Sequence, residues 1–386
     1  MREITYRLYG FIFTILKLFP LRKKKVVLFM IHNSNFKCNL KYIYEEMKKR
    51  DESYRFVIVS KKDIFRSRSN NQVVKMIKKL VGTFYFYFVL NYHFATAEYI
   101  CLNDNFLPLA HMKLKEETKL IQFWHGVGLF KKFGLSTETD PLVRKLVSTG
   151  NRQVDYQFVS APALVPYFEE AMGVDADHIY PIGIPITDYY FRADLHQKGR
   201  ERLHKLYPGT IGKKVILYMP TFRQTPEENN AILKHFDCER LLRVVGDDYV
   251  LLVRMHPQIR PDARELPKNC IDVTDYDDVK ELYILSDLLI TDYSSAVIEY
   301  ALLNRPMIFY AYDVERYDRG FYDPYEQMIP GPVVKNMEEL IQAVKSTGNT
   351  DYVNKREHFL QRHYGILDGQ ATTRVVDLIL SDEKHE

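Results

Sequence analysis

The stretch 122–134, QFWHGVGLFKKFG, places His125 between the only tryptophan of the chain, Trp124, and a glycine. Free histidine titrates near neutral pH, so a histidine here is able to take a proton from an alcohol. Lys131 and Lys132 follow on a turn that is able to face phosphate charge. The same pattern also fits a buried histidine bonded to backbone, with both lysines in solvent. The residues alone leave both interpretations open.

Polar residues also follow three strand-like runs in the second half of the chain. Thr221 and Arg223 follow KVILYMP, His256 lies near the end of YVLLVRMHP, and Ser294 and Ser295 end DLLITDYSS. Ligands of open α/β sheets bind beyond the carboxyl ends of the strands. Arginine is the usual planar phosphate clamp, and serines at a helix start present N–H groups and a positive dipole to an anion. Together these residues predict a site for a nucleotide diphosphate.

Glu299 lies one helical turn beyond the two serines. A carboxylate there is able to accept hydrogen bonds from ribose hydroxyls. The alternative is purely structural: Ser295 caps the helix, and Glu299 is an acid of the first turn that complements the helix dipole.

The elements that must position these residues alternate between strand-like and helix-like runs. Such alternation is typical of parallel sheets with crossover helices, so we predict an α/β fold of two doubly wound, Rossmann-like domains. Neither GxGxxG nor GxxxxGK[ST] is present, so neither a dinucleotide site nor a P-loop has support. The predicted strands are 26–31, 54–60, 93–102, 119–125, 156–161, 214–220, 249–257, 287–295 and 306–313, and the clearest helices are 40–50, 279–286 and 296–304.

At 386 residues the chain is long enough for two domains. The polar, turn-rich stretch 190–213 is the natural place for a boundary. We therefore divide the chain into an N-terminal segment, 1–25, and two domains, 26–195 and 196–386.

The basic residues gather in the N-terminal half. The first 25 residues have a net charge of +6 in a chain of +4, and Lys61–Leu80 holds a second basic patch. The apolar run Leu8–Leu21 is shorter than the roughly 20 residues that span a bilayer, and no cleavage site follows it. Two local patches fit an anionic membrane surface better than nucleic acid. We expect 1–25 to be an amphipathic, membrane-associating segment; an ordinary helix packed on the protein is the alternative.

Three further features carry weaker predictions. The four cysteines have no short paired spacing, so we expect reduced thiols and neither a disulfide frame nor a zinc site. Asp275-Tyr276-Asp277 matches a DxD metal motif, but its surroundings are more typical of a turn and helix start. The aromatic run Phe84–Phe88 is interpreted as core, because a strand-like run follows it and needs covering. Membrane contact by this run stays open.

Taken in order, WHG with KKFG, PTFR, RMHP, TDYSS and the P-x-x-F-Y-x-x-D of Pro306–Asp313 resemble the CDP-glycerol glycerophosphotransferase family of teichoic acid synthesis. The resemblance runs from about residue 26 to 370. It implies a GT-B fold in which an acceptor-side domain, 26–195, and a CDP-donor-binding domain, 196–386, face a cleft. It also implies metal-independent transfer of glycerol phosphate from CDP-glycerol, with no cofactor and with release of CMP.

The family's functional positions are all filled in this chain. The resemblance implies that His125 is the base, that Thr221, Arg223, His256, Ser294 and Ser295 bind the diphosphate, that His256 also acts in catalysis, and that Lys131 and Lys132 contact phosphate or acceptor. The family usually has aspartate where this chain has Glu299, so the carboxylate is kept with a longer reach.

The resemblance further implies a peripheral enzyme on the cytoplasmic face of the membrane, with an undecaprenyl-diphosphate-linked acceptor. Polymerases of the family typically carry extra segments, so we expect a primase that adds one or a few units. The alternatives are a CDP-ribitol ribitolphosphotransferase, a short glycerol-phosphate polymerase, a GT-B glycosyltransferase that uses a nucleotide sugar, and a membrane-bound scaffold. No nucleic acid partner is expected, and self-association stays open.

Overall fold

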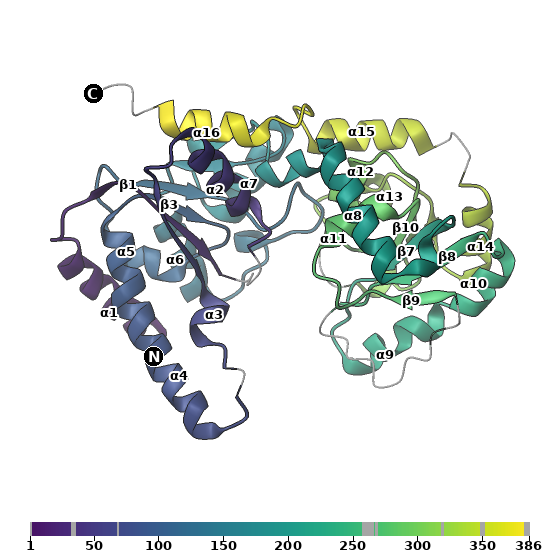
Figure 1. The fold of residues 1–386 in the computed structure, drawn as a ribbon, viewed down its shortest axis with the longest axis horizontal. Helices are drawn as coiled ribbons and strands as arrows, with labels where there is room; N and C mark the ends of the chain where they lie inside the picture. Colours follow the sequence, from purple (N-terminus) through teal and green to yellow (C-terminus); the bar gives the residue numbers. More distant parts are fainter. Residues whose placement is uncertain are drawn as a thin grey trace. The chain divides into compact units, whose positions relative to one another are not determined.

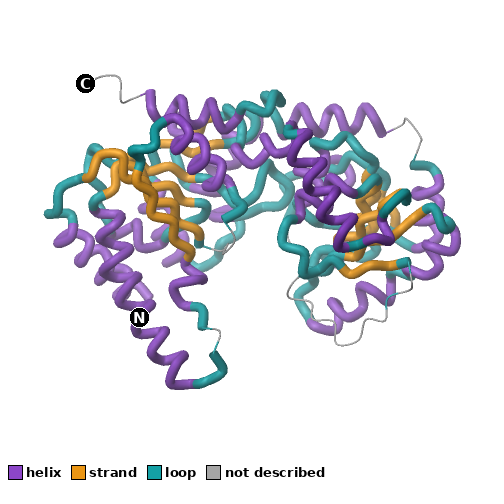
Figure 2. Tube along the Cα trace, in the orientation of Figure 1, coloured by secondary structure: helices purple, strands orange, loops and turns teal. Residues whose placement is uncertain are grey.

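The computed structural model describes residues 2–31, 36–67, 69–256, 266, 269–317, 320–347 and 352–381. The chain divides into two units, each built on one parallel six-stranded sheet (Figures 1 and 2). Unit 1 comprises 1–128, 132–188 and 364–386, and unit 2 comprises 129–131 and 189–363. The predicted boundary at 195/196 thus lies seven residues beyond the observed one. The last segment of the chain groups with unit 1, although we had placed it in the second domain.

In unit 1 the strand order is β2-β1-β3-β4-β5-β6. Val26–Met30 of β1 are all buried, as expected for a parallel strand that is covered on both faces. The elements of this unit are α1 (Arg2–Leu16), β1 (Arg22–Met30), α2 (Asn39–Arg50), β2 (Arg55–Ser60), α3 (Lys61–Phe65), α4 (Gln72–Phe84), η1 (Tyr85–Leu90), α5 (Asn91–Ala95), β3 (Ala97–Leu102), η2 (Leu107–His111), β4 (Lys119–Gln122), η3 (Gly134–Ser136), α6 (Pro141–Asn151), β5 (Tyr156–Phe158), η4 (Pro162–Leu164), α7 (Val165–Met172), η5 (Ala176–His178), β6 (Ile179–Tyr180) and α16 (Ala371–Ser381), and η6 (Pro185–Phe191) spans the boundary.

In unit 2 the strand order is β12-β11-β10-β7-β8-β9. The carboxyl ends of these parallel strands lie along one edge of the sheet. The elements are α8 (Ala193–Leu206), η7 (Pro208–Thr210), β7 (Lys214–Met219), α9 (Pro226–His235), α10 (Cys238–Val245), β8 (Tyr249–Val253), β9 (Cys270–Asp272), α11 (Val279–Leu285), β10 (Leu288–Thr291), α12 (Ala296–Ala301), β11 (Met307–Tyr310), η8 (Val314–Arg316), α13 (Tyr325–Met328), β12 (Val333–Val334), α14 (Met337–Lys345) and α15 (Val353–His363).

Local contacts explain why the end of the chain belongs to unit 1. The carboxylate of Asp188 accepts hydrogen bonds from the N–H groups of Ala371 and Thr372, at 2.9 and 2.8 Å, and so caps the start of α16. Arg50, at the end of α2, pairs with Asp377 of α16 at 2.6 Å. The two helices lie side by side in Figure 1. These contacts join residues more than 180 positions apart, so a local sequence pattern does not predict them.

Several predicted elements differ from the observed ones. The strand predicted over 93–102 begins only at Ala97, since α5 occupies its first part. Strand β1 begins at Arg22, so the N-terminal segment ends before residue 25. The aromatic run is helical, with Phe84 and Phe88 on one face, 60% and 45% exposed. Phe86 lies on another face, with its ring 5.0 Å from that of Tyr9. The interpretation of the whole run as core is therefore wrong for its two outer phenylalanines.

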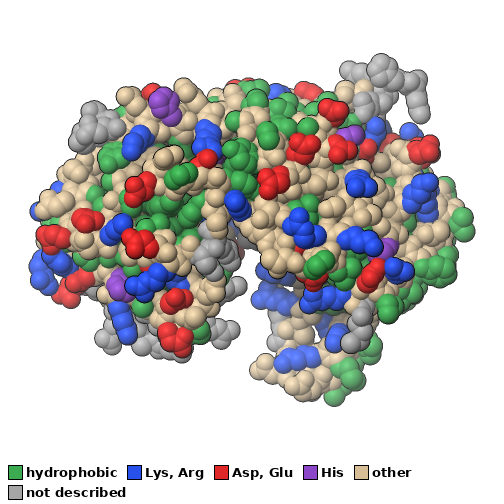
Figure 3. Space-filling model, turned by 180° about the vertical axis from the view of Figure 1, so that it is seen from behind, with side chains coloured by type: hydrophobic (Ala, Val, Ile, Leu, Met, Phe, Trp, Pro, Cys, Tyr) green, Lys and Arg blue, Asp and Glu red, His purple; other side chains and the backbone are tan. Residues whose placement is uncertain are grey.

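Two helices of unit 1 carry exposed apolar stripes. On α1 and the turn after it, Ile4, Leu8, Phe11, Ile15 and Leu18 are exposed at helical spacing. On α4 and the start of η1, the exposed apolar side chains are Val73, Val74, Met76, Ile77, Leu80, Val81, Phe84 and Phe88. Figure 3 shows green and blue side chains together on the projection formed by α3 and α4. Among the described residues, no helix meets the length and hydropathy that crossing a membrane requires.

Candidate active site

His125 has a carboxylate partner that sequence reasoning missed. Its Nδ1 lies 3.1 Å from Oδ2 of Asp104, whose Oδ1 accepts the N–H of Asn105 at 2.9 Å. Asp104 follows β3 and His125 follows β4, and these strands are parallel neighbours. Their carboxyl ends therefore bring both side chains to one edge of the unit 1 sheet. The sequence signal that could have identified Asp104 is CLND, 101–104, in which an acid follows the end of a buried strand by two residues.

The surroundings of His125 hold its ring in one orientation. The ring lies 4.1 Å from that of Trp124, and the Trp124 ring lies 4.9 Å from that of Phe133. The amide of Asn39 donates to the carbonyl oxygen of Trp124 at 3.3 Å. The Asp104 side chain is 8% exposed, whereas that of His125 is 46% exposed. With Nδ1–H donated to Asp104, Nε2 carries the lone pair, which is the arrangement that a general base requires.

In unit 2, Thr221 and Asp292 follow the neighbouring strands β7 and β10. The N–H of Thr221 donates to Oδ1 of Asp292 at 2.8 Å. The hydroxyl of Thr221 is buried and has no hydrogen-bond partner in the part of the chain that the structure describes. Buried hydroxyls in native proteins usually have a partner, so this one is suited to meet a ligand or water at the sheet edge.

Arg223 is buried between two acids. Its guanidinium donates to both oxygens of Asp313 at 2.6 and 3.0 Å, to Oδ2 of Asp292 at 3.0 Å and to the carbonyl of Thr221 at 2.6 Å. Burial alone lowers the pKa of the guanidinium, but the charges of Asp292 and Asp313 outweigh it and raise that pKa above its usual range. All three guanidinium nitrogens thus already donate to the protein. These bonds tie the guanidinium to two acids beyond the strand ends, and the predicted phosphate clamp stays a prediction.

His256 and the two serines lie on the same sheet edge as Thr221, because β8, β7 and β10 are neighbours. His256 is half-buried, with its ring 4.5 Å from that of Phe222. The hydroxyl of Ser294 accepts the N–H of Ala296 at 3.2 Å. Ser295 occupies the N-cap position of α12, but its exposed side chain makes no capping bond. The structural alternative, in which the Ser295 side chain caps the helix, is therefore not supported; the hydroxyl of Ser294 makes the bond to the helix start instead.

Glu299 lies in α12 and is half-buried. Burial raises its pKa, against the lowering effects of the Lys280 charge and of a hydrogen bond from Tyr190. That bond joins the Tyr190 hydroxyl to Oε2 of Glu299 at 2.9 Å. One carboxylate oxygen is thus already engaged inside unit 2.

The two lysines after the WHG motif have different surroundings. Leu129–Lys131 belong to unit 2, where the ammonium group of Lys131 donates to the Tyr317 hydroxyl at 3.3 Å. The N–H of Leu129 donates to Nδ1 of His363 at 3.4 Å. Lys132 is exposed and belongs to unit 1. The two lysines thus fall in different units, and their contact with phosphate or acceptor stays a prediction.

The acids around the DxD motif form a helix start. The carboxylate of Asp278 accepts the N–H of Lys280 at 3.2 Å and caps α11, as the interpretation of a turn and helix start requires. Within the described ranges, no three His, Cys, Asp or Glu side chains are grouped as metal ligands. The four cysteines are buried and free, as expected.

Two Rossmann-like domains, each built on one parallel six-stranded sheet, define a GT-B fold. The model of the family described as CDP-Glycerol:Poly(glycerophosphate) glycerophosphotransferase matches residues 11–381. The chain therefore belongs to this family. The solved structure of the wall teichoic acid polymerase TagF is 27% identical, with a TM-score of 0.77 over 100% of this chain and 97% of that one.

The relatives of this chain include both ribitol-phosphate and glycerol-phosphate enzymes. A teichoic acid ribitol-phosphate primase of Bacillus spizizenii is 35% identical over 94% of this chain and 92% of its own length. A poly(ribitol-phosphate) polymerase of the same species is 32% identical over 100% of this chain, which spans only 61% of that relative. A poly(glycerol phosphate) polymerase of that species is 28% identical over 98% of both chains. Length therefore does not separate primases from polymerases here, contrary to our expectation.

Proposed function

We propose that this chain transfers an alditol phosphate, with glycerol phosphate from CDP-glycerol as the first candidate, to a hydroxyl of an undecaprenyl-diphosphate-linked acceptor. CMP leaves, and the product serves wall teichoic acid or a related cell-surface polymer. The observation that carries the proposal is the hydrogen bond between His125 and Asp104, since it prepares a base for an alcohol. Membership of the glycerophosphotransferase family supports it.

In this proposal Nε2 of His125 removes the proton of the acceptor hydroxyl, and Asp104 stabilises the imidazolium that forms. The acceptor oxygen attacks the β-phosphorus of the CDP-alditol and forms a new phosphodiester. The bond between that phosphorus and the bridging oxygen breaks, and the bridging oxygen leaves on CMP. His256 in its protonated form donates to that oxygen. Positioning and electrostatics carry most of the acceleration in such reactions.

The residues of unit 2 then hold the donor. Thr221 offers its buried hydroxyl to the diphosphate, and Ser294 and Ser295 with the N–H groups at the start of α12 offer further donors. Arg223 acts through Thr221 and Asp292 by fixing their strand ends, and Glu299 binds ribose. Protein donors and histidine supply the positive charge, so we propose that no metal ion or other cofactor is needed; undiminished activity in EDTA would support this.

Ribitol phosphate is the second candidate. It is favoured by the ribitol-phosphate primase, which is 35% identical and aligns over nearly the full length of both chains. That alignment also supports transfer of one or a few units. The poly(glycerol phosphate) polymerase that aligns over 98% of both chains supports the alternative of chain extension.

The exposed stripes support a location at the cytoplasmic face of the membrane. The stripes on α1 and α4 present apolar side chains next to basic ones, which suits insertion among anionic headgroups. We expect vesicles with phosphatidylglycerol to bind the protein more tightly than neutral vesicles. Leu80→Glu on the α4 stripe should weaken this binding several-fold, whereas Thr83→Glu on the same helix should weaken it less. Equal binding to both vesicle types, unaffected by Leu80→Glu, would contradict the membrane assignment.

The deciding experiment measures CMP release by the purified chain with CDP-glycerol or CDP-ribitol, with and without a synthetic lipid-linked disaccharide, and determines product masses. One acceptor-dependent glycerol-phosphate increment would support the primase. A ladder of increments would support a polymerase, and activity with CDP-ribitol alone would make ribitol phosphate the substrate. No CMP release under any condition would contradict the proposed activity.

A further inference from the structure

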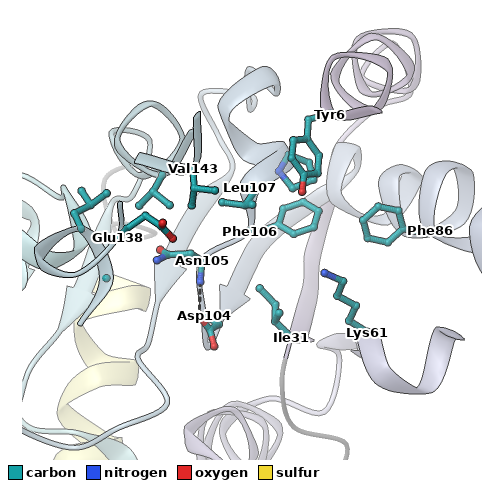
Figure 4. Close-up of a pocket in the computed structure, with 14 residues that line it drawn as sticks. Tyr6, Ile31, Lys61, Phe86, Asp104, Asn105, Phe106, Leu107, Glu138 and Val143 are labelled. Carbon is teal, nitrogen blue, oxygen red and sulfur yellow. Dashed lines mark hydrogen bonds between the residues drawn. The ribbon is translucent and has the colours of Figure 1, made fainter. Parts of the chain in front are cut away.

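Unit 1 contains a cavity of about 270 Å³ on the Asp104 side of the His125–Asp104 pair (Figure 4). Its walls are Tyr6 of α1, Lys61 of α3, Phe86 of η1, Asp104 and Asn105 after β3, and residues of η2, η3 and α6. All of these residues belong to unit 1. Neither the donor residues of unit 2 nor His125 itself lines the cavity, so the function proposed above leaves it unexplained.

One side of the cavity is built from the helices that carry the exposed apolar stripes. Tyr6 is half-buried on α1, between the exposed Ile4 and Leu8 in sequence. Phe86 is half-buried between the exposed Phe84 and Phe88. Each helix therefore directs one face to solvent and another to the cavity. A molecule anchored in a membrane under these stripes would have its headgroup close to the cavity.

Another side of the cavity is built from the catalytic edge of the sheet. Asp104 lines the cavity and also holds the His125 ring through its Oδ2 atom. Figure 4 shows Asp104 and Asn105 on one side of the space, with Phe86 on the other. The cavity thus extends from the membrane-facing helices to the carboxylate that orients the base. An acceptor has to cover the same route, from its lipid anchor to the base that deprotonates it.

The composition of the walls indicates which part of an acceptor fits. The rings of Tyr6, Phe86 and Phe106 offer flat apolar faces, and Lys61, Asn105 and Glu138 offer charged and amide groups. Few polar groups among aromatic walls are typical of small-ligand sites, which usually measure about 300–1,000 Å³. A cavity of about 270 Å³ lies just below that range, so it suits a single sugar or polyol unit better than a prenyl chain or a nucleotide.

We propose that this cavity binds a saccharide or polyol unit of the lipid-linked acceptor and thereby directs the acceptor hydroxyl to His125. The inference rests on the proposed function, since it presupposes an acceptor that is anchored in the membrane. In this arrangement the aromatic rings pack against the C–H face of the unit. Lys61 and Asn105 donate hydrogen bonds to its hydroxyls, and Glu138 accepts them.

Two pairs of substitutions test the proposal. Val143 of α6 lines the cavity and is half-buried, and its neighbour Leu142 is also half-buried but does not line it. Val143→Phe should raise the KM for the acceptor at least 10-fold, and Leu142→Phe should leave it within 2-fold. Lys61→Ala should raise the KM for the acceptor about 3- to 10-fold. Lys62→Ala removes a like charge from α3, but Lys62 does not line the cavity, so this variant should leave the KM for the acceptor unchanged.

The assay uses a water-soluble acceptor, the disaccharide diphosphate on a short prenyl chain, so that membrane binding does not enter. The KM for the CDP-alditol should stay within 2-fold in all four variants, and their melting temperatures should match the wild type. A wild-type acceptor KM in both Val143→Phe and Lys61→Ala would overturn the proposal, and so would a rise confined to the donor KM.

Direct titration of the same acceptor into the protein separates this proposal from the function itself. If no CDP-alditol supports turnover, the proposed activity fails, but binding of the acceptor can still be measured. A loss of affinity in Val143→Phe that Leu142→Phe does not share would then still support the cavity as a saccharide site. Equal affinity in the two variants would refute it.

Discussion

Replacing Asp104 by Asn tests the role of the carboxylate that lies 3.1 Å from His125 Nδ1. Asn keeps an oxygen for the N–H of Asn105 but removes the charge beside the ring. Two unit charges about 4 Å apart attract by about 4 kcal/mol at an effective dielectric constant of about 20, and by about 1 kcal/mol in water. His125 is 46% exposed and Asp104 only 8%, so the value for this pair lies between these limits.

A change of about 1.36 kcal/mol in the barrier changes the rate tenfold. The value in water therefore corresponds to a loss of about 5-fold in kcat, and the value at the lower dielectric constant to a loss of about 1,000-fold. An amide N–H facing Nδ1 would in addition favour the tautomer whose proton is on Nε2. In that tautomer Nε2 has no lone pair with which to accept the acceptor's proton. Loss of general-base catalysis lowers rates by about 10²- to 10⁴-fold. We therefore expect Asp104→Asn to lower kcat by about 100- to 1,000-fold, with the KM for the CDP-alditol within 2-fold of wild type.

The assay is steady-state CMP release with saturating acceptor, measured for Asp104→Asn, His125→Ala and the double variant. If Asp104 acts through His125, the double variant is no slower than His125→Ala, and the effects are far from additive. Asp140→Asn is the matched control, because Asp140 is also a carboxylate of unit 1, but it caps α6 and pairs with Arg2. Wild-type kcat in a folded Asp104→Asn variant, or additive losses in the double variant, would refute the assignment.

Three stability measurements check other parts of the structure. Arg223→Met leaves the buried carboxylate of Asp292 and the half-buried one of Asp313 without their cation and should lower the free energy of unfolding by about 3–5 kcal/mol in urea titrations; a loss of less than 1 kcal/mol would mean that water solvates both acids. Burial, together with the charge of a neighbouring arginine, lowers the pKa of His363 to about 3. The unfolded chain therefore takes up a proton below about pH 6.5, and stability falls from there towards pH 3 by up to about 1.4 kcal/mol per pH unit; His363→Asn should flatten this slope, and an unchanged slope would contradict the burial. Gly134→Ala should lower the melting temperature strongly, since its Cβ would lie 2.1 Å from the carbonyl oxygen of Ala171, whereas Gly212→Ala, also at positive φ but in open space, should lower it less; equal shifts would contradict the steric reason.

The sequence predicted the parts of this protein that depend on local pattern. Buried apolar runs such as Val26–Met30 identify strands, and the polar residues after them lie at the carboxyl-end edge of each sheet, where ligands of open α/β sheets bind. It missed Asp104 as the partner of His125, because their pairing depends on the neighbouring positions of β3 and β4 and not on spacing along the chain. The return of α16 to unit 1 was missed for a similar reason, since it rests on Asp188, which is 183 residues from Ala371.

Arg223 shows how motifs that look separate in sequence serve one structural purpose. PTFR supplies the arginine, TDYSS supplies Asp292, and the stretch Pro306–Asp313 supplies Asp313. Arg223, Asp292 and Asp313 follow β7, β10 and β11, which are neighbours in the unit 2 sheet, so one buried cation joins three strand ends. Removing Arg223 leaves the buried Asp292 and the half-buried Asp313 without their cation, which is strongly unfavourable, whereas removing either acid leaves Arg223 paired with the other. The motifs are therefore expected to occur together because they form one network, and in the proposed donor site the Thr221 hydroxyl, which lacks a partner among the described residues, is the group suited to meet the diphosphate.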